Sequence, residues 1–135
     1  MALHLPLPLQ QALCDQAQQD APQEVCGLLG GVQHGQTFYA QRHTPIPNVA
    51  PTPQVRFEMD HAAMVAAIFA LQRARMALIG VYHSHPHSAP TPSPADLAEC
   101  AWQAVPYLII GYAATQPALA AWLIDGTRFT YLPLI

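Results

Sequence analysis

The sequence contains no lysine, and charged residues make up only 10% of its 135 positions. Five basic residues, all arginine, stand against eight carboxylates and leave a net charge of −3. Proteins that bind nucleic acid through its phosphates need a basic face, so that class is excluded. Apolar residues make up 52% of the chain, the opposite of the balance in disordered proteins. We therefore expect a chain that folds around a core and binds no nucleic acid.

Paired cysteines and long apolar runs are also missing. The three cysteines, Cys14, Cys26 and Cys100, are widely spaced and form no C-x-x-C motif. They predict buried, reduced thiols in a cytoplasmic protein rather than a disulfide scaffold. The N-terminus has no basic segment and its apolar residues are interrupted by prolines, so no signal peptide is expected. The longest apolar run, Ala62–Leu71, is too short to span a membrane, so no membrane partner is expected.

Prolines and glycines divide the chain into short elements, and its length predicts one domain, residues 1–135. The expected helices are Leu9–Asp20, His61–Arg75 with Asp60 as N-cap, and a segment that begins near Ser93-Pro94. The expected strands are 24–31, which ends in paired glycines and a turn, its hairpin partner Thr37–Arg42, Met76–His83, Tyr107–Gly111, Leu119–Ile124 and Phe129–Leu132. Thr44–Pro53, with four prolines, predicts a loop. Interspersed helices and strands indicate an α/β or α+β sheet with helices packed against it.

Chemistry is concentrated in the segment from Tyr82 to Asp96. His83 and His85 lie two residues apart at the end of an apolar strand, so both imidazoles are predicted on one face. Pro86 ends the strand and leaves the pair accessible. Two imidazoles and a carboxylate are a common zinc ligand set that leaves one position open, and Asp96 is the candidate carboxylate. Three prolines stiffen the intervening loop, Pro86–Pro92, and lower the entropy lost when it closes around a metal.

Each of these residues also has a structural interpretation. Ser93-Pro94-Ala95-Asp96 is by itself a good helix start, with Ser93 as N-cap and Asp96 completing a capping box. Histidines at strand ends often do no more than bond backbone carbonyls. The combination of both histidines with Ser93 and Asp96 at fixed spacing favours the metal site over these alternatives.

Glu24, His83-Ser84-His85-Pro86, Ser93 and Asp96 together resemble the signature of the JAMM (MPN+, JAB) metalloproteases. The stretches 24–30, 48–57 and 79–83 also resemble prokaryotic members of that family. The resemblance implies an MPN-type central mixed sheet flanked by helices. It further implies that His83, His85 and Asp96 hold one zinc ion with a water in the fourth position. Glu24 would be the general base, and Ser93 would help hold the developing oxyanion, although one hydroxyl is not expected to cap the helix at the same instant.

Other residues near the motif have two interpretations. Without the motif, Glu24 would be a surface residue at a strand entrance. Cys26 is a conceivable fourth, thiolate ligand, but that would close the site, so a buried apolar cysteine is favoured. His87 is expected on the rim of the site rather than on the substrate. Asn48 either bonds a substrate backbone or makes an Asx-turn, which is favoured. Core positions are expected for Trp102 and Trp122, and a solvated helix end for Arg73 and Arg75.

The resemblance also implies a class of substrate. JAMM enzymes typically hydrolyse amide or isopeptide bonds at the C-terminus of ubiquitin-like proteins, and this chain is similar to the minimal bacterial form. It implies as partner a sulfur-carrier protein of the ThiS/MoaD kind with a Gly-Gly C-terminus, whose narrow tail can be added as a strand at a sheet edge. A phage-tail or other peptide substrate, and a non-catalytic MPN scaffold, are the alternatives.

Overall fold

The computed structural model describes residues 1–99, 102 and 104–135. The helices of this part of the chain are α1 (Leu7–Asp20), α2 (His61–Arg73) and α3 (Pro94–Ala98). The strands are β1 (Ala2–His4), β2 (Cys26–His34), β3 (Thr37–Ile46), β4 (Ala77–Ser84), β5 (Tyr107–Ala113), β6 (Gln116–Asp125) and β7 (Arg128–Leu132). The expected α+β class is confirmed.

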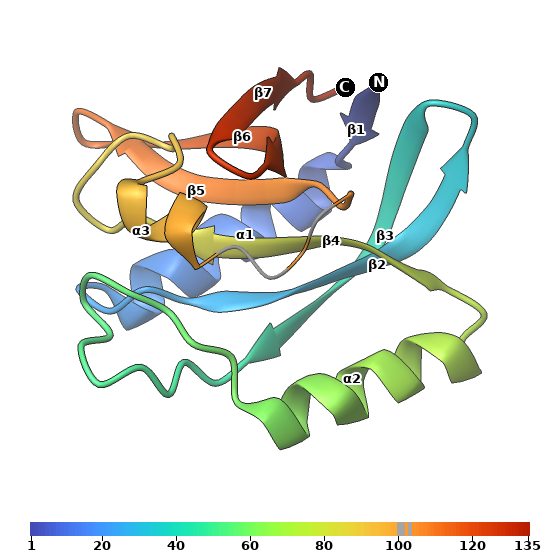
Figure 1. Cartoon of the computed structure of the whole chain (residues 1–135), viewed down its shortest axis with the longest axis horizontal. Coiled ribbons are helices and arrows are strands. Elements are labelled where there is room, and N and C mark those ends of the chain that lie inside the picture. The colour runs from blue at the N-terminus through green and yellow to red at the C-terminus, as the bar shows by residue number, and fades with distance from the viewer. Residues whose placement is uncertain (100–101, 103) are drawn as a thin grey trace.

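The strands form one mixed sheet in the order β1-β3-β2-β4-β5-β6-β7. β1 pairs in parallel with β3, and β4 with β5, whereas the remaining neighbours are antiparallel. The C-terminal residues return to β1, where Leu3 and Leu134 form a parallel bridge, so the two chain ends lie close together (Figure 1). β4 lies at the centre of the sheet, and the site described below forms at the C-terminal end of this strand.

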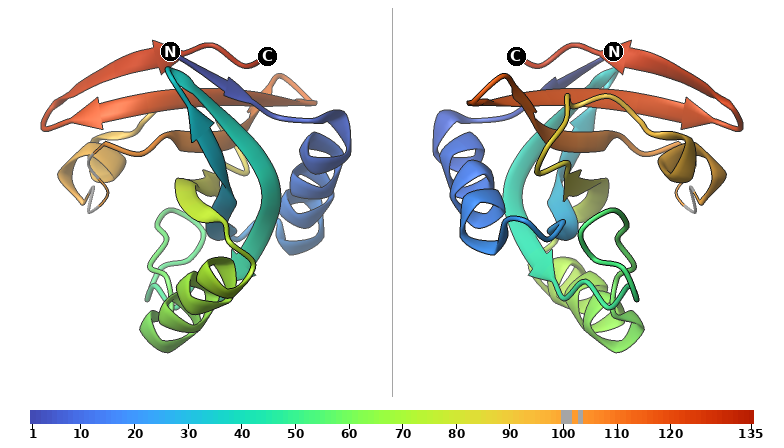
Figure 2. Two further views of the ribbon diagram at one scale, coloured as in Figure 1. Left: turned by 90° about the vertical axis from the view of Figure 1, so that its right-hand side faces the viewer. Right: turned by 90° about the vertical axis from the view of Figure 1, so that its left-hand side faces the viewer.

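Helices cover both faces of this curved sheet (Figure 2). α1 packs on one face through Leu13 and Ala17, over a core that includes Leu29, Tyr82 and Leu108. α2 packs on the other face, where Ala67 joins a second core cluster; this cluster also takes in Leu97 of α3. None of the described helices is long and apolar enough to cross a membrane.

The helix boundaries follow from their caps. The Asp60 carboxylate accepts a hydrogen bond from the Ala63 amide at 2.9 Å, so the predicted N-cap of α2 is confirmed. α2 ends at Arg73 rather than at Arg75, because Arg75 adopts a left-handed backbone with a φ of 59°. Arg73 and Arg75 are exposed, as predicted. α1 begins two residues earlier than expected, because Pro8 fits the first turn of a helix, where its missing N–H is not needed.

The hairpin of β2 and β3 is longer than predicted. The paired glycines were expected to end the first strand, but the β2 ladder continues to His34 and the turn lies at Gly35. Gly30 and Gly31 instead mark a shift of register between the two strands, a position where glycine is often found. The predicted loop Thr44–Pro53 is wrong at its start, because β3 continues to Ile46 opposite Cys26.

The predicted core tryptophans are only half-buried. Trp122 donates its indole N–H to the Pro90 carbonyl at 2.8 Å, so its ring lies between β6 and the loop after β4. Trp102 packs at the margin of the α2-side core. Cys26 is buried as expected, whereas Cys14 is only half-buried because it lies beside an open groove of α1. The prediction for Cys100 falls outside the described residues.

Candidate metal centre and active site

The end of β4 and the first turn of α3 bring His83, His85 and Asp96 together. The two Nε2 atoms of the histidines lie 3.2 Å apart. His83 Nε2 is 3.1 Å from Asp96 Oδ1, and His85 Nε2 is 3.0 Å from Asp96 Oδ2. All three residues are buried, and His83 is completely so. The prediction that period-2 spacing places both imidazoles on one face is confirmed.

This donor set fits a metal ion such as zinc. Zinc bonds of about 2.0–2.1 Å at tetrahedral angles place neighbouring ligand atoms roughly 3.3 Å apart. The three separations here, 3.0–3.2 Å, are close to that value, and the donor atoms all lie within 4.8 Å of one another. Two imidazoles with one carboxylate leave a fourth tetrahedral position open, as in catalytic zinc sites.

The ring of His85 is oriented by the loop that follows it. His85 Nδ1 lies 3.0 Å from the Ala89 carbonyl, so Nδ1 donates its proton to that carbonyl and Nε2 points into the cluster. The loop is fixed in turn to β5, where the Tyr112 amide donates to the Ser88 carbonyl at 2.8 Å. Gly111 permits this close approach, because a Cβ there would lie 2.5 Å from the Pro90 nitrogen.

His83 is held differently. Its ring stacks on Phe57, with centroids 4.4 Å apart and planes 24° from parallel. Its Nδ1 is the buried side-chain atom that finds no hydrogen-bond partner among the described residues. Packing against Phe57, rather than a hydrogen bond from Nδ1, therefore sets the orientation of this ring.

The electrostatics of the cluster favour a bound cation. Burial opposes ionisation of Asp96, but hydrogen bonds with His83 and His85 outweigh it and hold its pKa well below the usual range. Burial lowers the pKa of His83, which therefore stays neutral. Burial also opposes the charge on His85, but its hydrogen bonds with Asp96 and Ala89 raise its pKa. In the metal-free chain both Nε2 atoms therefore face an ionised Asp96, and a bound metal ion would take the place of the protons between them.

Glu24 lies beside this cluster because β2 and β4 are neighbours. Cys26 is opposite His83 in the antiparallel register, which places Glu24, two residues earlier, opposite His85. Glu24 is only 7% exposed, so the interpretation as a surface residue is wrong. Burial, with a further contribution from Asp96, raises the pKa of Glu24 to about 7. A carboxylate with that pKa can accept and release a proton near neutral pH.

Ser93 caps α3 as predicted. Its Oγ accepts from the Asp96 amide at 3.1 Å, while the Ser93 amide donates to Asp96 Oδ2 at 2.9 Å. In this bond the hydroxyl is an acceptor, so its proton is still available for donation. Capping of α3 therefore does not use up this proton, and whether the hydroxyl serves both purposes at once stays a prediction. The capping box also fixes the Asp96 carboxylate in place.

Comparison with known proteins identifies the family of this chain. A family model described as "Prokaryotic homologs of the JAB domain" matches residues 6–125. The chain belongs to this family. The resemblance to JAMM metalloproteases is thus confirmed, and this JAB domain is a JAMM-type metalloprotease with a His-His-Asp metal site.

Two curated relatives and two solved structures are similar to this chain along most or all of its length. The "Probable TtuB-protein conjugate cleaving protease" of Thermus thermophilus is 35% identical over 133 residues, 98% of this chain and 78% of the relative. The "Desampylase" of Haloferax volcanii is 40% identical over 90 residues, 67% of this chain and 63% of the relative. A solved structure from Desulfitobacterium hafniense has a TM-score of 0.90 at 28% identity, covering 98% of this chain and 91% of its own. One from Salinibacter ruber has a TM-score of 0.73 at 26% identity, covering 100% and 90%.

The structure also bears on the predictions for three residues around the JAB-domain site. Cys26 is not a ligand: its thiol donates to the Ile46 carbonyl at 3.4 Å, and burial raises its pKa to about 12. Asn48 makes the predicted Asx-turn, since its Oδ1 accepts from the Ala50 amide at 3.0 Å. His87 is exposed in the loop after His85, consistent with a position on the rim.

Sequence reasoning missed the residues that orient the others. Ser84 bonds the backbone of Val25, Phe57 stacks on His83, and Gly111 admits the loop that carries Ala89. These contacts join segments distant in the sequence, so no local pattern identified them. Only the alternation of Ser84 with the two histidines offered a signal, because it places Ser84 toward the opposite face.

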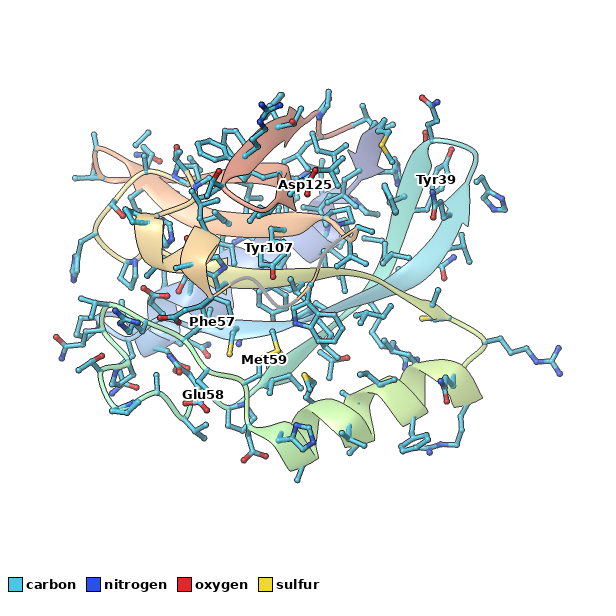
Figure 3. All side chains as sticks on the ribbon, in the orientation of Figure 1. Tyr39, Phe57, Glu58, Met59, Tyr107 and Asp125 are labelled. Atoms are coloured by element: carbon cyan, nitrogen blue, oxygen red, sulfur yellow. The ribbon has the colours of Figure 1, made fainter. Side chains whose placement is uncertain are left out.

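An apolar cleft of about 450 Å³ opens beside Asp96. Phe57 and Met59, on the loop before α2, and Tyr107, at the start of β5, lie around it (Figure 3). Arg56 on that loop forms an ion pair with Glu99 at the end of α3. Asp96 is the metal-site residue that lines this cleft, so the cleft adjoins the site on the side of α3.

Proposed function

We propose that this JAB-domain protein is a zinc metallopeptidase. Its proposed substrate is the amide or isopeptide bond at the C-terminus of a ubiquitin-like protein, of the sulfur-carrier kind that ends in Gly-Gly. The observation that carries the proposal is the position of Glu24: a buried carboxylate with a pKa of about 7 lies opposite His85, beside the His83–His85–Asp96 group.

His83, His85 and Asp96 would hold one zinc ion per chain. Zinc, when bound, supplies a Lewis acid that makes water a nucleophile near neutral pH. Glu24 would take the proton of the attacking water and pass it to the leaving amine. Ser93 can donate its hydroxyl proton to the substrate oxygen that gains negative charge, because its lone pair already caps α3.

The substrate class is supported by the relatives and by the cleft. One relative is named for cleaving TtuB-protein conjugates and another is a desampylase. A diglycine tail has no side chains to exclude it from a narrow passage, and the cleft beside Asp96 leaves room for the residues next to it. The scaffold alternative would be favoured by loss of Glu24 or a ligand, and this chain retains all of them.

The test is mass spectrometry of Gly-Gly carrier proteins incubated with the zinc-loaded protein. The carriers are prepared with a C-terminal peptide extension or as isopeptide conjugates to a lysine-containing protein. We expect a product that ends in Gly-Gly, no product after chelation, and recovery of activity when zinc is restored. Intact carriers, together with cleavage of unrelated peptides under the same conditions, would overturn the substrate and favour the phage-tail type of alternative.

A further inference from the structure

Asn48, just after β3, uses its whole side chain in hydrogen bonds. Nδ2 donates to the Glu24 carbonyl at 2.9 Å and to the Arg56 carbonyl at 3.0 Å. Oδ1 accepts from the Ala50 and Glu58 amides, each at 3.0 Å. A carboxamide has two N–H donors and two acceptor lone pairs, so its capacity is filled. The Asx-turn accounts for one of these four bonds and leaves the other three to be explained.

One end of this network holds the backbone of Glu24. Its carbonyl accepts from Asn48, and its amide donates to the Pro53 carbonyl at 2.7 Å. Both partners belong to residues 47–60, which we call the bracing loop. The Glu24 backbone is therefore fixed on both sides by the bracing loop, and the position of its carboxylate depends on that attachment.

The other end of the network holds Phe57. The Arg56 carbonyl and the Glu58 amide, both bonded to Asn48, lie immediately before and after Phe57. The Phe57 ring in turn stacks on His83. A single carboxamide thus connects the backbone of the residue assigned as base to the ring that packs on a metal-site histidine. The Asn48 carboxamide also bonds the backbone of the segment that lines the cleft, since Phe57 and Glu58 are lining residues.

We propose that Asn48 is a positioning residue for hydrolysis, which keeps Glu24 in register with the metal-site residues. This inference rests on the proposed function. Proton transfer requires a fixed separation between base and water, and small displacements of catalytic groups lower rates steeply. Loss of partners that orient a metal site typically lowers activity about 10–100-fold, and the same range is expected for Asn48→Ala.

The kinetic test compares two variants of the bracing loop in the full, zinc-loaded chain. Asn48→Ala should lower kcat about 10–100-fold while the metal content stays at the wild-type level. Asp60→Ala is the matched control: it removes the N-cap of α2 at the end of the same loop and leaves the Glu24 contacts in place. It should keep kcat within about twofold of wild type, the precision of such comparisons.

A double-mutant cycle separates positioning from a general loss of structure. If Asn48 acts through Glu24, then Asn48→Ala should change kcat by less than about threefold in a Glu24→Gln background, because the two effects are not additive. An equal fold-loss in both backgrounds would overturn the inference. Full activity of Glu24→Gln alone would instead overturn the proposed function, so the two failures are distinguishable.

Amide hydrogen exchange of the metal-free protein gives a readout independent of activity. The Glu24 amide should be protected in wild type and in Asp60→Ala, but should exchange at least about tenfold faster in Asn48→Ala. Asn48→Asp keeps the shape and both acceptor positions but removes both donors, so it should behave like Asn48→Ala. It also serves as the second variant if Asn48→Ala does not fold. Unchanged protection in the folded variants would contradict the inference.

Discussion

Val25 and Ser84 bond each other through two hydrogen bonds across β2 and β4. The Val25 amide donates to the Ser84 hydroxyl at 2.8 Å, and the Ser84 amide donates to the Val25 carbonyl at 3.0 Å. Val25 follows Glu24, and Ser84 lies between His83 and His85. This pair therefore fixes the spacing between the residue assigned as base and the two metal-site histidines.

The Ser84 hydroxyl should contribute to stability as well as to geometry. Ser84→Ala leaves the buried Val25 amide without its acceptor, which costs about 1–3 kcal/mol for an unsatisfied buried donor. Urea unfolding of the metal-free variant measures this loss. Ser84→Thr keeps the hydroxyl and serves as the control, although it adds a methyl group. A Ser84→Ala variant as stable as wild type would show that water or another group replaces the bond.

The ligand set predicts which variants lose the metal. His83→Ala and Asp96→Ala each remove one of three protein donors, so metal affinity should fall by more than the roughly 10–100-fold typical of changes outside the ligand shell. Metal analysis after dialysis should find about one zinc per chain in wild type and little in either variant. His87→Ala is the control, because His87 is exposed in the same loop and should keep its zinc. A full complement in His83→Ala contradicts the assignment.

Sequence and structure agree where the determinants are local. The Asp60 cap, the Ser93–Asp96 capping box and the shared face of His83 and His85 all follow from spacings of a few residues. Glu24 could be assigned a role only through resemblance, because a lone carboxylate before a strand has no distinctive pattern. The three-residue strand β1 was missed, since its partners, β3 and Leu134, are distant from it in the sequence. The bonds of Asn48 to Glu24 and Glu58 were missed for the same physical reason.

Ser93 allows capping and catalysis to be separated. Ser93→Ala should lower the unfolding free energy by about 1 kcal/mol, the usual cost of a lost N-cap. It should also lower kcat about 10²–10³-fold, as expected when a donor to the oxyanion is removed. Ser93→Asn restores a good N-cap but not the hydroxyl, so stability should return while kcat stays low. Recovery of kcat along with stability would assign Ser93 to the helix alone.

The raised pKa of Glu24 makes stability depend on pH in a defined direction. In the metal-free folded chain its pKa is about 7, against 4.5 for an unhindered carboxyl, so folding favours the protonated form. That contribution is complete below pH 4.5 and is lost as pH rises through 7. Glu24→Gln removes the ionisable group. The unfolding free energy of Glu24→Gln minus that of wild type should therefore increase by about 2–3 kcal/mol between pH 5 and pH 8. A difference that stays constant with pH means that Glu24 has an ordinary pKa.

The most direct test of the account is Glu24→Gln measured for both bound zinc and rate. Glutamine keeps the shape of the side chain but cannot take a proton from water. Because Glu24 is not a ligand, the variant should retain about one zinc per chain and lose at least about 10²-fold in kcat. Asp125→Asn, which removes an exposed carboxylate at the end of β6 and away from the site, is the control and should keep its rate. Loss of zinc from Glu24→Gln, or a rate equal to that of wild type, would contradict the assignment of Glu24 as general base.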